Sequence, residues 1–135
     1  LHNDSRVTMM VYWNSGVGMM RAPGTDQESP GEFLKTITRP LAFFAGDTDM
    51  ARQGSTSNFE TVAKAPCLLA VRQIPGDSHG GTFRENNGGA FGVAAVAWLD
   101  WWTKGDEEAG KMFLGDKSGL EKDPGWVEVR RKNLR

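Results

Sequence analysis

Two acidic side chains and a histidine stand directly after apolar segments of the sequence. Asp47 and Asp49 follow the run 41–45, and His79 lies in a glycine-rich loop after the run 67–74. In open parallel sheets, ligands bind beyond the carboxyl ends of the strands, where these loops would lie. A histidine there can act as a general base, and a preceding aspartate can orient its second ring nitrogen and stabilise the imidazolium. This pattern predicts the Asp–His half of a Ser-His-Asp system.

The elements that must position these groups alternate between strands and helices. Continuous apolar runs predict buried strands over 7–13, 41–45 and 67–74. Helical spacing or apolar character predicts helices over 57–64 and 91–103, shorter helical segments over 30–35 and 106–114, and a loop over 17–31. Such alternation predicts an α/β fold, with a parallel β-sheet segment of about three strands and flanking helices.

Length, charge and cysteine content exclude several classes of protein. The 135 residues fit one domain, and the net charge of −1 provides no general attraction to nucleic acid or to an anionic membrane. We therefore expect neither a nucleic acid nor a membrane as partner. No apolar run approaches the roughly 18 residues that span a bilayer. Cys67 is the only cysteine, which excludes an intramolecular disulfide and a zinc site built from cysteines.

We expect a single partial domain over 1–135. Its sheet and helices would lie within 1–114, and the charged tail 115–135 would form a peripheral extension. Three strands would leave an apolar sheet edge open, which soluble proteins usually avoid. The sheet is therefore expected to continue in a missing segment or in a partner chain.

The stretch from Asp4 to Asn133 resembles the C-terminal half of an α/β-hydrolase of the esterase and dienelactone-hydrolase-like kind. Three regions carry the resemblance. The first would follow the nucleophile-bearing helix, the second is the acid loop, and the third is the histidine loop with the final packing helix. They are Asp4-Ser5-Arg6-Val7 with Asn14-Ser15-Gly16; Ala45-Gly46-Asp47-Thr48-Asp49; and Ser78-His79-Gly80-Gly81-Thr82-Phe83, Asn87-Gly88-Gly89-Ala90-Phe91-Gly92 and Ala97-Trp98-Leu99-Asp100-Trp101. The last of these three is the most specific.

The resemblance implies serine-dependent hydrolysis of a small carboxylic ester, without a metal or organic cofactor. His79 would deprotonate the serine and then protonate the leaving alcohol, with hydrolysis proceeding through an acyl-enzyme. The family pattern favours Asp49 over Asp47 as the triad acid, with Asp47 capping or bracing its loop. Asp77, two residues before His79, is interpreted as a turn residue.

The chain departs from the family pattern at the nucleophile. A Gly-x-Ser-x-Gly elbow is absent, and the nearest serine, Ser15, has Trp13 in the place of the first glycine. We interpret Ser15 as part of a strand-end turn. The serine and oxyanion hole would then come from outside this chain, and the expected partner is a complementary N-terminal chain or, in self-association, a second copy of the chain. Because two of three triad members cannot complete the reaction, we expect no esterase activity from this chain alone.

Two other interpretations remain open. The chain could be a non-catalytic interaction or structural module derived from a hydrolase half, which associates through its open sheet edge. Less favoured is a divalent-metal site on the loop residues Asp47, Asp49, Asp77 and His79. Gly80-Gly81 and Gly88-Gly89 lack the Gly-Lys-Ser/Thr ending of a phosphate-binding loop. We expect Trp98 and Trp101 to pack in the core and Trp102 to reach its edge.

Overall fold

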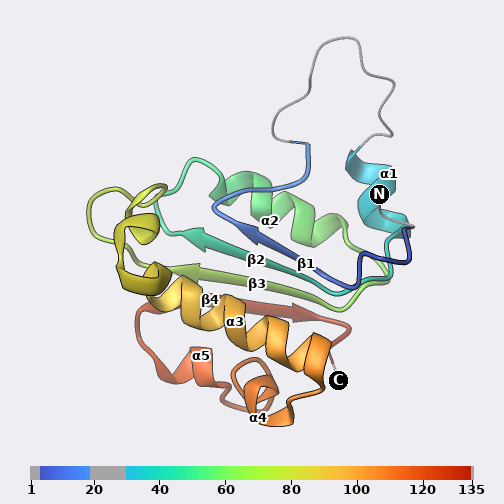
Figure 1. The fold of residues 1–135 in the computed structure, drawn as a ribbon. Coiled ribbons are helices and arrows are strands. Elements are labelled where there is room, and N and C mark those ends of the chain that lie inside the picture. The colour runs from blue at the N-terminus through green and yellow to red at the C-terminus, as the bar shows by residue number, and fades with distance from the viewer. Residues whose placement is uncertain (1–3, 19–29, 135) are drawn as a thin grey trace.

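The computed structural model describes residues 4–18 and 30–134. A four-stranded sheet in the order β1-β2-β3-β4 forms its centre (Figure 1). The strands are β1 (Met10–Trp13), β2 (Leu41–Gly46), β3 (Cys67–Arg72) and β4 (Trp126–Lys132). The pairs β1–β2 and β2–β3 are parallel, whereas β4 runs antiparallel to β3. The α/β class is therefore confirmed, but the expected sheet of about three parallel strands is wrong because a fourth strand makes it mixed.

Helices cover both faces of this sheet (Figure 1). One face carries α1 (Pro30–Thr36) and α2 (Arg52–Thr61). The other carries α3 (Gly89–Lys104), α4 (Glu107–Gly110) and α5 (Gly119–Lys122), with the 3₁₀ turns η1 (Gly81–Arg84) and η2 (Asn86–Gly88) leading into α3. The expected helical segment over 30–35 is confirmed, whereas α2 begins five positions before the expected Ser57. The helix expected over 106–114 is limited to α4, and most of the expected loop 17–31 lies outside the described residues.

The central strands are buried on both faces because alternate side chains enter two separate cores. On β2, Leu41 and Phe43 face the cluster beneath α1 and α2, and Ala42 and Phe44 face the cluster beneath α3. Every residue of β2 is buried. A parallel strand covered on both faces needs an unbroken apolar sequence, which explains why β2 was predictable from its composition.

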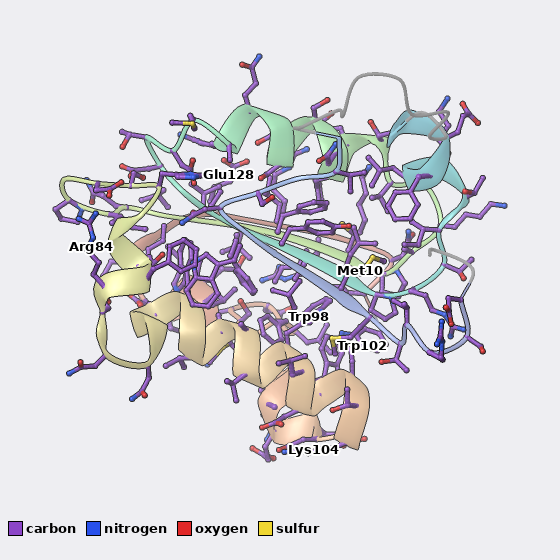
Figure 2. All side chains as sticks on the ribbon, turned by 45° about the horizontal axis from the view of Figure 1, so that its top comes forward. Met10, Arg84, Trp98, Trp102, Lys104 and Glu128 are labelled. Atoms are coloured by element: carbon purple, nitrogen blue, oxygen red, sulfur yellow. The ribbon has the colours of Figure 1, made fainter. Side chains whose placement is uncertain are left out.

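The core beneath α3 is rich in aromatic side chains. Trp98 is fully buried, and its ring meets Phe113 edge to face with the centroids 5.2 Å apart. Trp101 is partly buried and stacks on Phe113, and Trp102 packs partly buried against the same cluster. Figure 2 shows Trp98 and Trp102 between α3 and the sheet. These tryptophans therefore pack against the core, as the apolar character of the helix predicted.

The C-terminal tail belongs to the sheet, which corrects the interpretation of 115–135 as a peripheral extension. β4 pairs with the whole length of β3. Lys132 Nζ donates to the backbone oxygens of Phe59, Glu60 and Val62 at 3.0, 2.7 and 3.1 Å, where α2 ends. The carbonyl groups at a helix C-terminus have no intrahelical partner and attract positive charge. The tail thus closes one sheet edge and caps a helix.

β1 forms the opposite edge of the sheet. All four of its residues are half-buried, whereas β2 is buried throughout. Met10 and Asn14 donate their backbone N–H groups towards β2, to the oxygens of Pro40 and Phe44. Among the described residues, no strand pairs with the outer side of β1.

In the same part of the chain, no helix combines the length and apolar character that crossing a membrane requires.

Candidate functional site

Asp49 and His79 meet at the carboxyl ends of β2 and β3. Oδ1 of Asp49 lies 2.8 Å from Nδ1 of His79. The Asp49 side chain is 0% exposed and the His79 side chain is 48% exposed. A carboxylate oxygen only accepts hydrogen bonds, so Nδ1 donates, and in the neutral ring the lone pair then lies on Nε2. The structure therefore brings together two of the side chains that the sequence singled out, with the imidazole ring orientated by a buried carboxylate.

The second oxygen of Asp49 has no hydrogen-bond donor in the described part of the chain, although it is buried. Oδ1 accepts a second bond, from the backbone N–H of Ala51 at 2.7 Å. A buried carboxylate that is only partly compensated interacts strongly with a nearby positive charge. Asp49 is therefore placed to stabilise a positive charge that develops on the His79 ring.

Asp47 braces the two loops and does not contact His79 through a hydrogen bond. Its Oδ1 accepts from the backbone N–H of Ile74 at 3.2 Å and from the hydroxyl of Ser78 at 3.4 Å. The Ser78 hydroxyl in turn accepts from the backbone N–H of Thr48 at 3.2 Å. Asp47 and Ser78 thus connect the loop after β2 to the loop after β3.

Gly46 permits this close approach of the two loops. A Cβ atom at this position would lie 2.0 Å from Oγ of Ser78 and 2.4 Å from its carbonyl oxygen. Real Cβ atoms do not approach other heavy atoms so closely, so any larger residue would push the Ser78–His79 segment away from β2. The glycine before the acid loop therefore has a packing role that helps to place His79.

Asp77 shapes the turn that presents His79. Its Oδ1 accepts from the backbone N–H groups of His79 at 3.2 Å and Gly80 at 2.8 Å. These bonds, with that to Gly80 first, hold the pKa of the Asp77 carboxyl below its ordinary value. Such bonds from an aspartate to the backbone two and three residues later are typical of turns.

Asn14 is a part of the site that the sequence did not reveal as such. It follows β1 with a φ of 48° and is buried. Its amide donates to the carbonyl of His79 at 2.5 Å and to the hydroxyl of Thr82 at 3.4 Å, and its Oδ1 accepts from the backbone N–H of Gly46. Asparagine tolerates the left-handed region better than most residues, and this preference is the signal that could have marked the position.

Trp13 supports the same segment from the end of β1. Its indole N–H donates to the hydroxyl of Thr82 at 2.9 Å. Its ring stacks on Phe83 with the centroids 5.4 Å apart, and Phe83 is 62% exposed. The chain after His79 is therefore held against β1 by polar and aromatic contacts together.

Ser15 shows no arrangement of a nucleophile in the described part of the chain. Its backbone oxygen accepts a hydrogen bond from the Ser55 hydroxyl at 2.8 Å, and no hydrogen bond joins its own hydroxyl to His79. A serine activated by this histidine would need to lie within hydrogen-bond reach of Nε2. The geometry agrees with a strand-end turn for Ser15.

The residues considered for a metal site are engaged elsewhere. Within 4–18 and 30–134, no group of three or more histidine, cysteine, aspartate or glutamate side chains is arranged to hold an ion. Asp47 and Asp77 bind backbone and hydroxyl groups of their own loops. A site for a hard divalent ion needs several oxygen ligands converging on one point, which these side chains do not provide.

A groove of about 470 Å³ lies on the α3 face, away from the loops that carry Asp49 and His79. It is lined by Ala90 and Val93 of α3, residues of α4 and α5, and Trp126 at the start of β4. None of its lining residues belongs to either loop. The groove is therefore not part of the Asp49–His79 site.

No model of a known protein family matches the sequence, and no curated protein matches it. The chemistry of the site is accordingly argued from its own geometry.

Proposed function

We propose that this chain is the C-terminal portion of a serine hydrolase that acts on small carboxylic esters. The observation that carries the proposal is the 2.8 Å contact between the buried Asp49 carboxylate and Nδ1 of the half-exposed His79. This arrangement fixes the tautomer in which Nε2 can accept a proton. A serine hydroxyl supplied from outside the described residues would complete the triad.

Each side chain has a definite role in the proposed reaction. Nε2 of His79 takes the proton of the serine hydroxyl as the serine oxygen attacks the ester carbonyl. The same nitrogen then gives this proton to the leaving alcohol, and an acyl-enzyme remains. Water attacks the acyl-enzyme with His79 again as the base. Asp49 keeps the ring orientated and stabilises its charged form in both halves of the reaction, and no metal or organic cofactor is required.

A polypeptide that bears the serine should restore activity. We would combine this chain with the N-terminal part of its parent protein and measure hydrolysis of an alkyl ester, ethyl butyrate, by titration of the acid released at constant pH. A fluorophosphonate probe would show which polypeptide carries the reactive serine. Native and denaturing mass spectrometry of the starting material would show whether a second polypeptide already accompanies the chain. Turnover and probe labelling that both require the two parts are the expected result.

Substitutions then assign the roles. In the complemented enzyme, His79→Ala should lower kcat on the order of 10⁶-fold and Asp49→Asn on the order of 10⁴-fold. Asp77→Asn is a matched control, because an amide oxygen can still accept the turn hydrogen bonds. It should retain most of the activity. Near-normal turnover in the His79→Ala variant would overturn the proposal.

A second candidate function is association without catalysis, and the exposed edge of β1 favours it. The N–H groups of Met10 and Asn14 point to β2, so the intervening residues Val11 and Trp13 direct theirs away from the sheet. An edge strand with free backbone groups can accept another strand. The partner would be a complementary N-terminal chain or a second copy of this one.

The backbone geometry of β1 provides a direct test of strand addition. Val11→Pro removes an outward N–H without removing a bond to β2, and proline is tolerated at such edge positions. Val11→Thr keeps the N–H and serves as the control. If association is by strand addition, sedimentation velocity should show weaker association for Val11→Pro alone. Equal association of both variants would exclude pairing at this edge, and association without regained esterase activity would favour the module over the enzyme half.

A further inference from the structure

His79 has the features of a nucleophile in its own right. Its Nδ1 is anchored on a buried carboxylate, and roughly half of its side chain is open to solvent. We propose that this chain alone accepts an acyl group on Nε2 of His79 from activated aryl esters. The proposal rests on the Asp49–His79 geometry and does not require that a serine be supplied from elsewhere.

The hydrogen bond to Asp49 makes Nε2 the reactive nitrogen. In free imidazole the proton exchanges between the two nitrogens, so each carries the lone pair for part of the time. Here the proton is held on Nδ1 by the carboxylate at 2.8 Å. The described part of the chain places no hydrogen bond on Nε2, so its lone pair is not engaged. The ring is thereby orientated with its nucleophilic atom away from Asp49.

The reaction consists of two balanced steps. The Nε2 lone pair attacks the ester carbonyl carbon, a C–N bond forms, the C–O bond to the aryl group breaks, and the aryl oxide leaves with its electron pair. The ring then carries a positive charge, which the Asp49 carboxylate stabilises. Water next adds to the carbonyl carbon and the C–N bond breaks, which releases the carboxylate and its protons and restores His79.

The leaving group determines which esters can react. An aryl oxide is stable enough to depart unprotonated, whereas an alkoxide needs a proton, and the attacking imidazole has no proton on Nε2 to give. For alkyl esters we therefore still expect no esterase activity from the chain alone. For aryl esters this expectation no longer applies. Acylation of His79 by aryl esters is a separate activity, because it needs neither the serine nor an oxyanion hole.

The other nucleophilic side chains are less suited to this reaction. Cys67 is fully buried, and burial raises the pKa of its thiol to about 12. Lysine side chains are ammonium ions near neutral pH and lack a free lone pair. His2 is the other histidine in the sequence, so it provides the natural control.

The experiment uses the chain as it is, with p-nitrophenyl acetate as the acyl donor. Release of p-nitrophenolate is followed by absorbance, and acid-quenched samples are digested and analysed by mass spectrometry to locate the acetyl group. We expect one acetyl group on the peptide that contains His79. We also expect release on the order of tenfold faster than for the His79→Ala variant at equal concentration.

Two further variants test the role of the geometry. Asp49→Asn should also slow release on the order of tenfold, because an amide that donates to Nδ1 moves the ring proton to Nε2. His2→Ala should leave the rate unchanged. Circular dichroism confirms that each variant is folded, and the site of acetylation in the unsubstituted chain does not depend on any variant.

Each outcome decides the matter. Acetyl groups on lysines alone, or an unchanged rate in His79→Ala, would overturn the proposal. The result is distinguishable from that of the complementation experiment, which uses an alkyl ester and requires the second polypeptide. His79 can therefore be acylated even if complementation restores no activity, and complementation can restore activity even if His79 is not acylated.

Discussion

The side-chain amide of Asn14 donates a hydrogen bond to the backbone carbonyl of His79 at 2.5 Å. The two residues are 65 positions apart in the sequence. Through this bond, the end of β1 holds the backbone on which the histidine ring is mounted. The oxygen of the same amide group accepts from the backbone N–H of Gly46, so one buried side chain connects the ends of β1 and β2 to the loop after β3.

Replacing Asn14 by aspartate should loosen the His79 loop. The aspartate retains an acceptor for the Gly46 N–H but loses the amide donor, and its carboxylate faces the His79 carbonyl. Leaving that partly buried carbonyl without its donor and opposite a carboxylate should lower the free energy of unfolding by about 1–3 kcal/mol. Urea denaturation measures this loss, and NMR spectra of the His79 ring should show a changed resonance.

Asn133→Asp is the matched control for this substitution. Asn133 also has a positive φ, of 53°, and its amide donates to the carbonyls of Ala63 and Ala65. Its contacts lie at the end of α2 rather than at the site. The control should destabilise the protein without altering the His79 resonance. A shifted His79 resonance in Asn133→Asp would contradict a specific role for Asn14.

Lys132→Met should weaken the attachment of the C-terminal strand. The substitution keeps an apolar stem over the Phe59 ring but removes the ammonium group, which lies 5.1 Å from the ring centroid and donates to three carbonyls. We expect a loss of about 1–2 kcal/mol in the free energy of unfolding, because a charged cap at a helix C-terminus is lost. Lys64→Met, at an exposed lysine, should change stability by less than about 0.5 kcal/mol. Equal effects would show that the cap does not contribute.

Acid should weaken the contact between α5 and β4. The Arg131 guanidinium, helped by the Ser118 N–H, lowers the pKa of the Glu121 carboxyl from 4.5 to about 2. The folded-state pKa is depressed, so this stabilisation is present above pH 4.5 and is lost as the pH falls towards about 2. Since the Glu121 side chain is about one-third exposed, the effect should stay below about 1 kcal/mol.

The measurement is the urea midpoint across this pH range for the unsubstituted chain and for Glu121→Gln. The variant should show a shallower dependence on pH, and added salt should reduce the difference between the two proteins. Parallel pH profiles would show that the Glu121–Arg131 pair makes no contribution.

The thiol of Cys67 should be unreactive until the protein unfolds. Burial at the start of β3 raises its pKa to about 12 and leaves none of the residue exposed. Thiolate is the form that reacts with disulfide reagents, so both accessibility and ionisation oppose the reaction. Labelling with Ellman's reagent should follow the unfolding curve in urea. Rapid labelling of the native protein would contradict the burial of this strand.

The two central strands and α3 were predictable because their sequences are apolar almost without interruption. β2 is buried throughout and β3 nearly so. A strand that is covered on both faces needs apolar side chains at almost every position. Asp49 and His79 could be predicted as neighbours because the carboxyl ends of adjacent parallel strands meet at one sheet edge. Their catalytic roles stay predictions.

β4 was missed because its sequence does not show apolar alternation. On the α2 side it uses long charged side chains, and the Arg130 guanidinium lies 4.8 Å from the ring centroid of Phe59. The aliphatic stems of such residues cover apolar surface while their charged ends stay in solvent. α5 did carry a sequence signal, since Ser118 and Glu121 form a capping box. The role of Asn14 depends on contacts made 65 positions away, which no local pattern predicts.

The position of β4 also sets the order in which the protein can be completed during synthesis. β3 lies inside the sheet, yet the strand that covers its edge is translated only after β1, β2 and α3. Until residue 132 has emerged, a nascent chain that has already made β1, β2 and α3 presents the backbone edge of Leu69 and Val71 to solvent. Exposed edges of unfinished sheets promote aggregation. The nascent chain is therefore vulnerable between the synthesis of β3 and that of β4, and a chain truncated before Trp126 would leave that edge open permanently.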